Sequence, residues 1–599
     1  MSNDAKSNGV VHAPSIRRRD AKGWLATGAV AGCLAGGVAL WALWRPLPWL
    51  PIPQGTLAQH AGFWIKLAAH HFVDGAFDHD ARAYARFWRE IGSGSRAQII
   101  WRAAAATCAA GMPLVFLAPK FLTRKDGLTF LRGSTRYEDR EAVDRLREKM
   151  AKFGRLDHEI APGVPFPSAM WTRHTLVVGG TGAGKSTILR PLIQKIIDAD
   201  EQLLLFDPKG EFTSGFERPS IIAPWDRRSL AWDLAKDLRN LLDMRRFAAA
   251  MVRDSHDPMW SNASRQLIVG LLVHLKAERG EDWGWRELAE LIVLPQSALL
   301  AIMRACHSEA IRAVETASVT TAGVLINLSA FCSPIFDLAM AWGDAPKERR
   351  VSMIEWTEGR SPHRQLVIQG HGAYSDLTKS CVEGMVGVFA ARINSVETDD
   401  DSTRKLWFVA DEFGQAGKLP VRPLFEVGRS RGVRCAIACQ DFAQLEELYG
   451  EKAIRALLAM CGTLIVGELM PGETSEAICR TLGGREVERR NVSVSQGEGG
   501  SRTTSVSYSR DEISLYKPSE LASRLGKTED GAGVKMVLFT RGEAYELAWP
   551  YCSLQIKRPA HEPAPWTLGV PSAMASPPLA SSDDVNVSSA KHASNKGGA

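Results

Sequence analysis

Two long apolar stretches near the N-terminus stand out from an otherwise mixed pattern of hydrophobic and polar positions. Residues 23–44, GWLATGAVAGCLAGGVALWALW, contain no charged side chain. A helix of this length rises far enough to cross the roughly 30 Å hydrocarbon core of a bilayer. Residues 97–118 form a second, weaker stretch with Arg102 near its start, where a long side chain can extend to the interface. The pattern predicts two transmembrane helices.

Charge around the two stretches predicts their orientation. Basic residues precede the first stretch and follow the second: Arg17, Arg18, Arg19 and Lys22, then Lys120, Arg124 and Lys125. Because basic flanks favour the cytoplasmic side, we expect a bacterial inner-membrane protein with both termini in the cytoplasm. Residues 1–22 are then a cytoplasmic tail, and residues 45–96 are a small helical periplasmic loop. A cleaved signal peptide fits less well, because the apolar run is too long and Trp-Arg-Pro follows it.

The first stretch also carries a repeat of small residues. Gly28, Gly32 and Gly36 recur every four residues and form one face of the predicted helix. Such a face either lets another helix approach closely or is simple Ala/Gly filling. The sequence leaves both interpretations open.

After residue 119 the pattern changes to short apolar runs that alternate with helical segments. Runs at 203–206, 406–410 and 435–439 are strand-like, and helical periodicity recurs between them, near 379–394 and 421–431, and again near 442–460. This alternation predicts an α/β fold with a mostly parallel, doubly wound sheet.

Helical periodicity alone fills residues 233–345, which predicts an all-helical insertion. The insertion would divide the α/β domain into two parts, residues 119–232 and 346–558. Alternating Val and Ser around a Gly-Glu-Gly-Gly turn predicts an exposed hairpin over 491–510. The Ala-, Ser- and Pro-rich residues 559–599 are expected to be disordered.

Composition excludes several classes of protein. The chain has 599 residues, with 45% hydrophobic and 23% charged side chains, which is typical of globular domains. A net charge of +6 is too small to indicate nucleic-acid binding by itself. The ten cysteines include no C-x-x-C pair and none in the predicted periplasmic loop. We therefore expect neither a zinc site nor a disulfide framework.

One glycine-rich segment carries a chemical signature. It matches the phosphate-binding pattern G-x-x-x-x-G-K-[ST] between a predicted strand and a predicted helix, and its members are Gly179, Gly180, Thr181, Gly182, Ala183, Gly184, Lys185, Ser186 and Thr187. Backbone N–H groups at a helix N-terminus attract phosphate, and the helix dipole favours the anion there. Lys185 would reach the β- and γ-phosphates of ATP, and the Ser186 hydroxyl would bind Mg²⁺.

A second strand ends in two carboxylates. Residues 406–410 are apolar, and Asp411 and Glu412 follow them directly. Ligands bind at the carboxyl ends of strands in open α/β sheets, so we assign Asp411 to the Mg²⁺ and Glu412 to the attacking water. A solvated acidic turn is the alternative, and the phosphate-binding loop favours the metal site.

Two further residues are candidates for catalysis. Gln440 ends the next predicted strand, and it is either a sensor of the γ-phosphate or an ordinary polar strand end. Arg429 and Arg431 are candidates for an arginine supplied by a neighbouring subunit, with Arg431 slightly preferred. Surface ion pairs are the alternative for both arginines.

Together these motifs resemble the type IV coupling proteins, the TraD-like ATPases of conjugation and type IV secretion. The resemblance covers most of the chain. Its further motifs, in order, are Arg132-Gly133-Ser134-Thr135-Arg136, Asp207-Pro208-Lys209-Gly210-Glu211, Asp257-Pro258-Met259-Trp260, Lys418-Leu419-Pro420 and Gly428-Arg429-Ser430-Arg431-Gly432. The short, non-acidic C-terminal segment departs from the family pattern of docking through an acidic tail.

The resemblance implies a fold, a reaction and partners. It implies a RecA-like P-loop NTPase that assembles as a homo-hexamer on the inner membrane, with the helical domain at its cytoplasmic mouth. It also implies that ATP and Mg²⁺ are used to move relaxase-bound single-stranded DNA to the subunits of a type IV secretion channel.

Four other functions are alternatives to this one. A coupling receptor for protein effectors alone remains open. A chromosome-type translocase of double-stranded DNA would need more spans and a C-terminal winged helix, and an ABC exporter would need a Leu-Ser-Gly-Gly-Gln-type signature. A scaffold with an inactive loop is disfavoured, because the lysine, the hydroxyl and both carboxylates are present.

Overall fold

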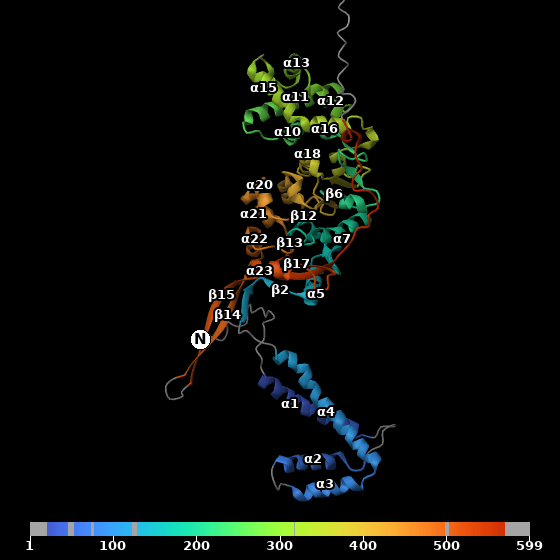
Figure 1. Cartoon of the computed structure of the whole chain (residues 1–599), viewed down its shortest axis with the longest axis vertical. Coiled ribbons are helices and arrows are strands. Elements are labelled where there is room, and N and C mark those ends of the chain that lie inside the picture. The colour runs from blue at the N-terminus through green and yellow to red at the C-terminus, as the bar shows by residue number, and fades with distance from the viewer. Residues whose placement is uncertain are drawn as a thin grey trace, which may run out of the picture. The chain divides into compact units, whose positions relative to one another are not determined.

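The computed structural model describes residues 21–45, 53–72, 77–122, 128–316, 318–496 and 502–569. The chain forms two compact units (Figure 1): residues 1–133 with 484–513, and residues 134–483 with 514–599. Most of the predicted N-terminal tail, the hairpin turn at 497–500 and the chain beyond 569 lie outside the described residues.

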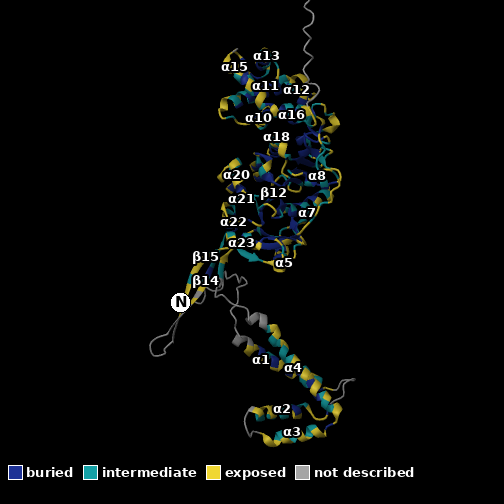
Figure 2. Cartoon of the chain, viewed as in Figure 1, coloured by how far each residue is buried: buried dark blue, intermediate teal, exposed yellow. Residues whose placement is uncertain are grey.

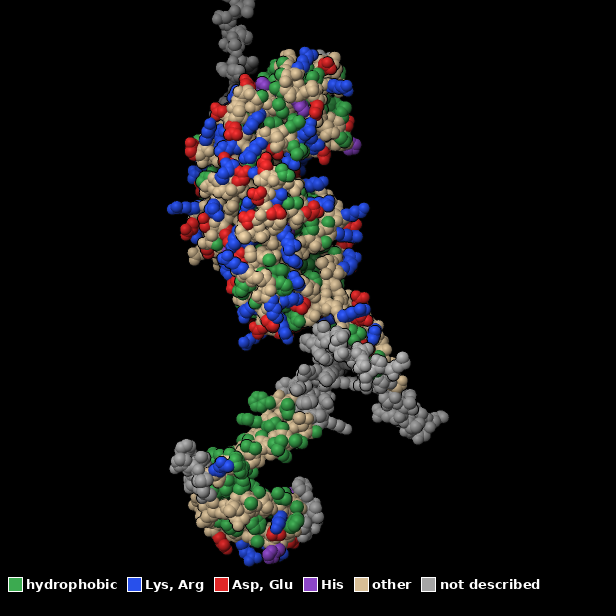
Figure 3. Space-filling model, turned by 180° about the vertical axis from the view of Figure 1, so that it is seen from behind, with side chains coloured by type: hydrophobic (Ala, Val, Ile, Leu, Met, Phe, Trp, Pro, Cys, Tyr) green, Lys and Arg blue, Asp and Glu red, His purple; other side chains and the backbone are tan. Residues whose placement is uncertain are grey.

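The first unit contains the two apolar helices. Helix α1 (Ala21–Leu43) packs along α4 (Ser93–Leu122). Within them, Leu25–Leu43 and Ser93–Leu117 are each long and apolar enough to cross a membrane. Hydrophobic side chains dominate the surface of this helical pair, whereas charged side chains cover much of the larger unit (Figure 3).

The repeated glycines of α1 lie against α4. A Cβ on Gly36 would stand 3.2 Å from the Cβ of Ala110, and one on Gly32 would overlap the Ala110 carbonyl oxygen. The small face is therefore a helix-packing surface, which decides between the two interpretations above. Arg102 does not extend outward from this pair: its Nε donates to the Leu43 carbonyl oxygen over 3.0 Å, so it holds the end of α1.

Two amphipathic helices, α2 (Leu57–Phe72) and α3 (Asp78–Glu90), connect the apolar pair. The Tyr84 hydroxyl joins them, because it lies 3.1 Å from His60 Nδ1 and accepts from Trp64 Nε1 over 3.0 Å. The unit also contains a three-stranded sheet in the order β1-β14-β15, with strands β1 (Leu128–Gly133), β14 (Gly484–Gln496) and β15 (Arg502–Ser514).

An eleven-stranded sheet forms the centre of the second unit, in the order β2-β18-β17-β13-β5-β12-β11-β6-β10-β7 with β16 paired to β17. The strands from β7 to β13 are parallel, and β17 is antiparallel to β13. Their bounds are β2 (Thr135–Tyr137), β5 (Thr175–Val178), β6 (Gln202–Asp207), β7 (Ser220–Ile222), β10 (Gln365–Gln369), β11 (Leu406–Ala410), β12 (Val433–Cys439), β13 (Thr463–Val466), β16 (Gly526–Lys527), β17 (Gly533–Thr540) and β18 (Glu543–Pro550).

Both faces of this sheet are buried, which explains the unbroken apolar runs of its strands (Figure 2). Alternate residues enter two hydrophobic clusters, so that Trp407 and Val409 face one side and Phe408 the other. One side is covered by α5 (Asp139–Met150) and α7 (Lys185–Asp198), together with the hairpin of β3 (Leu156–Ala161) and β4 (Val164–Pro167). The other is covered by α18 (Ser375–Ile393), α19 (Val421–Glu426), α20 (Phe442–Tyr449), α21 (Glu451–Met460) and α22 (Glu473–Leu482).

The helical insertion departs from the sheet between two short paired strands, β8 (Ala231–Trp232) and β9 (Arg350–Val351). Its helices are α9 (Leu234–Asp237), α10 (Leu241–Met251), α11 (Pro258–Arg279), α12 (Trp285–Ile292), α13 (Gln296–Cys306), α14 (Ile311–Val314), α15 (Val319–Phe331) and α16 (Ser333–Trp342). The Asp-Pro-Met-Trp motif begins α11: Asp257 caps it through the Met259 N–H over 3.0 Å, and Pro258 occupies the first turn.

Several boundaries differ from the sequence prediction. The helix expected near 421–431 ends at Glu426, and the strands of the hairpin expected over 491–510 begin at Gly484 and end at Ser514. The helix expected near 442–460 is divided into α20 and α21, because Gly450 has a φ of 83° that interrupts the helix. Residues 559–569, assigned above to the disordered tail, are ordered against the sheet edge. There the Glu562 N–H donates to Asp226 Oδ2 over 2.8 Å and Trp566 Nε1 donates to the Pro224 carbonyl over 2.8 Å.

Candidate nucleotide site

The glycine-rich loop joins β5 to α7 at the carboxyl end of the sheet. Gly182 and Gly184 have φ angles of 81° and 90°, which side chains other than glycine adopt rarely. A Cβ on Gly184 would lie 2.7 Å from Val534 Cγ1. Ala183 and Thr187 are buried and fix the loop and the first helical turn, whereas Thr181 is exposed. The loop therefore presents its backbone N–H groups at the start of a 14-residue helix.

Lys185 lies inside this loop. Its Nζ donates to the carbonyl oxygens of Gly179 and Gly180 over 2.8 Å and 3.2 Å. Burial lowers the pKa of Lys185, and the nearby carboxylates of Glu412 and Asp411 oppose that effect. The ammonium is thus held beside the loop amides, where a polyphosphate chain would lie.

The structure brings the loop and the two carboxylates together. The Ser186 hydroxyl donates to Asp411, with both carboxylate oxygens 2.9 Å from Oγ. The two residues are 225 positions apart in the sequence. They meet because only β12 separates β11 from β5 in the sheet. A hydroxyl paired with a carboxylate at this edge is the donor set that Mg²⁺ uses in P-loop enzymes.

Gln440 joins the loop to the second carboxylate. Its Nε2 donates to Glu412 Oε2 over 2.8 Å, and its Oε1 accepts from the Thr181 hydroxyl over 3.1 Å. Gln440 follows the end of β12, which lies between β5 and β11. One side chain therefore contacts both the phosphate-binding loop and the residue assigned to the water.

Two residues of this site were not assigned from the sequence. Asp207 ends β6 beside Asp411, and its Oδ2 accepts from the Thr213 N–H and hydroxyl over 2.9 Å and 3.0 Å. Burial raises the pKa of Asp207 to about 6, and the charge of Asp411 adds to the effect. Lys209 is exposed on the same turn, close enough to Asp411 and Lys185 to affect both. The Asp-Pro-Lys-Gly-Glu motif was the signal that could have found them.

The arrangement fits a bound cation. Burial raises the pKa of Asp411 and of Glu412, because each carboxylate is held away from water. Within the described residues, Asp207 Oδ1 and Glu412 Oε1 are buried without a hydrogen-bond partner. A divalent cation with its water ligands would satisfy such oxygens.

The two arginine candidates lie in different environments. The Arg431 guanidinium donates to the carbonyl oxygens of Ile393 and Ser395, the latter over 2.7 Å, so it is held by its own chain. Arg431 Nε also lies 3.5 Å from Asp400 Oδ1. Arg429 is exposed and has no ion pair in the described part of the chain. Neither contacts the loop of its own subunit, and the assignment of one of them to a neighbouring site stays a prediction.

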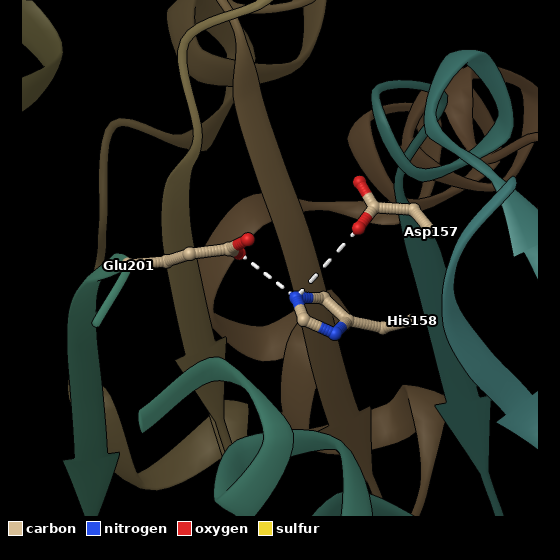
Figure 4. A group of neighbouring side chains, drawn as sticks. All are labelled: Asp157, His158 and Glu201. Carbon is tan, nitrogen blue, oxygen red and sulfur yellow. Dashed lines mark hydrogen bonds and ion pairs between the residues drawn. The ribbon is translucent and has the colours of Figure 1, made fainter. Parts of the chain in front are cut away.

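A second cluster, of two carboxylates and a histidine, lies at the opposite end of the strands. His158 Nε2 is 2.9 Å from Glu201 Oε2 and 3.8 Å from Asp157 Oδ1 (Figure 4). These carboxylates are already bonded to cationic groups: Lys405 Nζ lies 2.9 Å from Asp157, and Arg434 Nη1 lies 2.8 Å from it. This group is therefore a buried ion-pair network that ties β3 to the beginnings of β11 and β12.

Comparison with known families settles the class of protein. Residues 158–533 match the family model described as the type IV secretion-system coupling protein DNA-binding domain. This span is more than half of the chain. The chain belongs to the type IV secretion-system coupling proteins.

One curated relative supports the same class. This coupling protein is 22% identical to the coupling protein TraD of Escherichia coli (strain K12) over 355 residues, which are 55% of this chain and 48% of TraD. The chain thus spans about half the length of that relative.

Solved coupling proteins share the fold. The unbound conjugative coupling protein TrwB is 23% identical, with a TM-score of 0.57 over 72% of this chain and 96% of that one. A structure of TrwB in complex with ADP and Mg²⁺ is 22% identical, with a TM-score of 0.57 over 73% of this chain and 98% of that one. These likenesses confirm the predicted RecA-like P-loop fold with a mostly parallel sheet and a helical insertion. The two apolar N-terminal helices are present in this chain as predicted.

Proposed function

We propose that this coupling protein hydrolyses ATP with Mg²⁺ and uses the energy to pass relaxase-bound single-stranded DNA to a type IV secretion channel. The observation that carries the proposal is the contact chain at the carboxyl ends of β5, β12 and β11. It joins Thr181 to Gln440, Gln440 to Glu412, and Ser186 to Asp411. These residues come from three separate parts of the sequence and surround one phosphate-binding loop.

Each residue has a role that follows from its position. Lys185 would neutralise the β- and γ-phosphate oxygens, and Ser186 with Asp411 would hold Mg²⁺, which would supply positive charge to the phosphates. Glu412 orients and polarises the attacking water, and its raised pKa suits a proton acceptor. Gln440 positions Glu412 relative to the loop through its two hydrogen bonds. Phosphoryl transfer depends chiefly on such placement and charge.

The location follows from the two apolar helices. We propose that Leu25–Leu43 and Ser93–Leu117 cross the bacterial inner membrane, with both termini in the cytoplasm. ATP is available on that side, where the basic flanks also favour it. The helical pair α2 and α3 would then lie in the periplasm.

The proposed assembly is a homo-hexamer in which each site is completed by the next subunit. An arginine added to a phosphoryl-transfer site from a neighbour can raise the rate by roughly 10³–10⁵-fold. Arg429 is exposed and Arg431 is tethered to its own chain, so this structure favours Arg429 over the residue preferred from the sequence. The family match to a DNA-binding domain and the resemblance to conjugation proteins support the DNA cargo and the channel partners.

The deciding experiment measures ATP hydrolysis by the full-length protein in detergent or nanodiscs, with and without single-stranded DNA. We expect hydrolysis that single-stranded DNA stimulates, and loss of hydrolysis in the Lys185→Ala variant with membrane insertion intact. Normal hydrolysis in that variant would remove the loop from the mechanism. Hydrolysis that DNA leaves unchanged would contradict DNA transport and favour a receptor for protein effectors.

A further inference from the structure

A cleft opens between the helical insertion and the sheet domain, away from the phosphate-binding loop. Its volume is about 670 Å³. The end of α10 and the start of α11 form one wall, α18 forms the other, and the loop that follows β11 closes one end. Five cationic and three carboxylate side chains line it: Arg246, Arg253, Arg265, Lys379 and Lys418, with Asp254, Glu383 and Glu447.

Three of these cations form no direct ion pair in the described residues. Arg265 is paired with Asp254 over 2.8 Å, and Arg246 lies 3.2 Å from Asp243. Arg253, Lys379 and Lys418 instead surround Glu383 and act on its carboxylate only through space. Glu383 Oε1 also accepts the backbone N–H of Lys418 over 2.6 Å, but its single negative charge is outnumbered by the three cations. The cleft therefore carries an excess of positive charge that an anionic ligand would balance.

The remaining lining favours a sugar–phosphate backbone as that ligand. It consists of small and aliphatic groups such as Ala250, Ala391 and Pro423, and no aromatic side chain is among the residues that line the cleft. Bases could not stack there, so recognition would depend on phosphates and would be independent of sequence. A volume within the range of small-molecule pockets admits a short length of single strand but not a duplex.

The cleft is connected to the nucleotide site through one short segment. Asp411 and Glu412 are followed by the turn Phe413–Ala416, and Lys418 comes two residues later. Tyr449 holds this segment: its ring stacks on Phe413 with centroids 5.8 Å apart, and its hydroxyl accepts the Leu419 N–H over 2.7 Å. A ligand that binds Lys418 would therefore act on a segment that Tyr449 holds in place and that begins at Glu412, the residue assigned to the water.

We propose that this cleft binds the phosphodiester backbone of single-stranded DNA and that its occupation is transmitted to Glu412 through the segment that ends at Lys418. The inference rests on the proposed function, since it assigns a binding site to the DNA that the motor moves. All the residues involved lie within the part of the chain that matches the DNA-binding domain family.

The test compares two triple variants of the full-length protein in nanodiscs. One removes the unpaired cleft cations, Arg253→Ala/Lys379→Ala/Lys418→Ala. The control removes three exposed cations that do not line the cleft, Arg304→Ala/Arg312→Ala/Lys452→Ala, and changes the net charge equally. Binding of fluorescent dT30 is measured from 50 to 500 mM salt, together with ATP hydrolysis and nucleotide affinity.

Three lost phosphate contacts would reduce the slope of log K against log salt by about 2, at ~0.7 per contact on a single strand. If the two proteins bind DNA equally at 1 M salt, this difference in slope corresponds to about 50-fold weaker binding by the cleft variant at 150 mM. We expect this loss, and loss of stimulation by DNA, in the cleft variant alone, with basal hydrolysis and nucleotide affinity unchanged. Lys418→Gln, at an exposed position, should show about one third of the change in slope if the triple variant does not fold.

Equal DNA binding by the cleft and control variants would overturn the inference while leaving the proposed function standing. Binding of an acidic peptide, polyglutamate, to the cleft would also overturn the inference if an excess of dT30 did not displace it. Failure of the unaltered protein to bind dT30 would overturn both.

Discussion

Replacing Asp157 by asparagine tests how the strands that carry the nucleotide site are held at their other end. Asp157 lies on β3 and bonds Lys405, which precedes β11, and Arg434, which lies on β12. Burial by itself would raise the pKa of Asp157, but the hydrogen bonds from Lys405 and Arg434 outweigh it and lower the pKa from 3.8 to about 2. The folded state therefore favours the ionised carboxylate.

The size of the effect follows from this lowering. At ~1.36 kcal/mol per pKa unit, the ionised group contributes about 2.4 kcal/mol to stability. Because the folded pKa lies below the unfolded one, the contribution is present above pH 4 and is lost as the pH falls toward 2. Roughly half of it remains at pH 3. The side chain is only 11% exposed, so solvent screening reduces this value little.

Hydrogen exchange of the β11 and β12 amides is the appropriate assay, because a chain of several domains need not unfold in two states. At pH 7 the Asp157→Asn variant should exchange these amides about 60-fold faster than the unaltered protein, after correction for intrinsic rates. The difference should shrink as the pH is lowered to 3. The control is Glu451→Gln, which removes an exposed helix pair with Arg455 and should change exchange by less than about threefold.

Equal protection of β11 and β12 in the two proteins at pH 7 would refute the reasoning. A difference that does not depend on pH would also refute it, because a packing defect rather than the charge would then be responsible.

Three further changes test other parts of the molecule. Glu412→Gln should lower turnover by roughly 10²–10⁴-fold and keep ATP binding; turnover near the original rate would exclude Glu412 as the water-orienting group. Subunits that lack the loop lysine can be mixed with subunits that carry Arg429→Ala or Arg431→Ala. Some hydrolysis should return when the replaced arginine is the one that acts in a neighbouring subunit, and no recovery at any ratio would count against a shared site. Gly32→Leu should destabilise the α1–α4 pair by ~1–3 kcal/mol of overpacking, whereas Gly37→Leu, with nothing within 4 Å, should not; equal melting temperatures in detergent would contradict this.

Local signals were sufficient for much of the fold. The glycine-rich loop was predicted from its motif between a strand and a helix, and the positive φ angles of Gly182 and Gly184 explain why glycine is needed there. The strand before Asp411 was predicted because burial on both faces of a sheet leaves an unbroken hydrophobic run. The apolar spans were predicted because each is long and apolar enough to cross a bilayer. Errors arose where one residue overrode periodicity, as at Gly450, or where distant contacts ordered a polar segment, as at Glu562 and Trp566.

By itself, the sequence determined which residues are candidates for binding phosphate and metal, because the signals for both lie in short segments whose backbone conformation and chemistry are local. Only the tertiary structure decided which of them meet. Gln440 bridges Thr181 and Glu412 because β12 is inserted between β5 and β11. Likewise, Arg253 faces Lys379 and Lys418 because the helical insertion folds back toward α18. Strand order and domain packing are set by the burial of surfaces far apart in the chain, and no local pattern of residues encodes them.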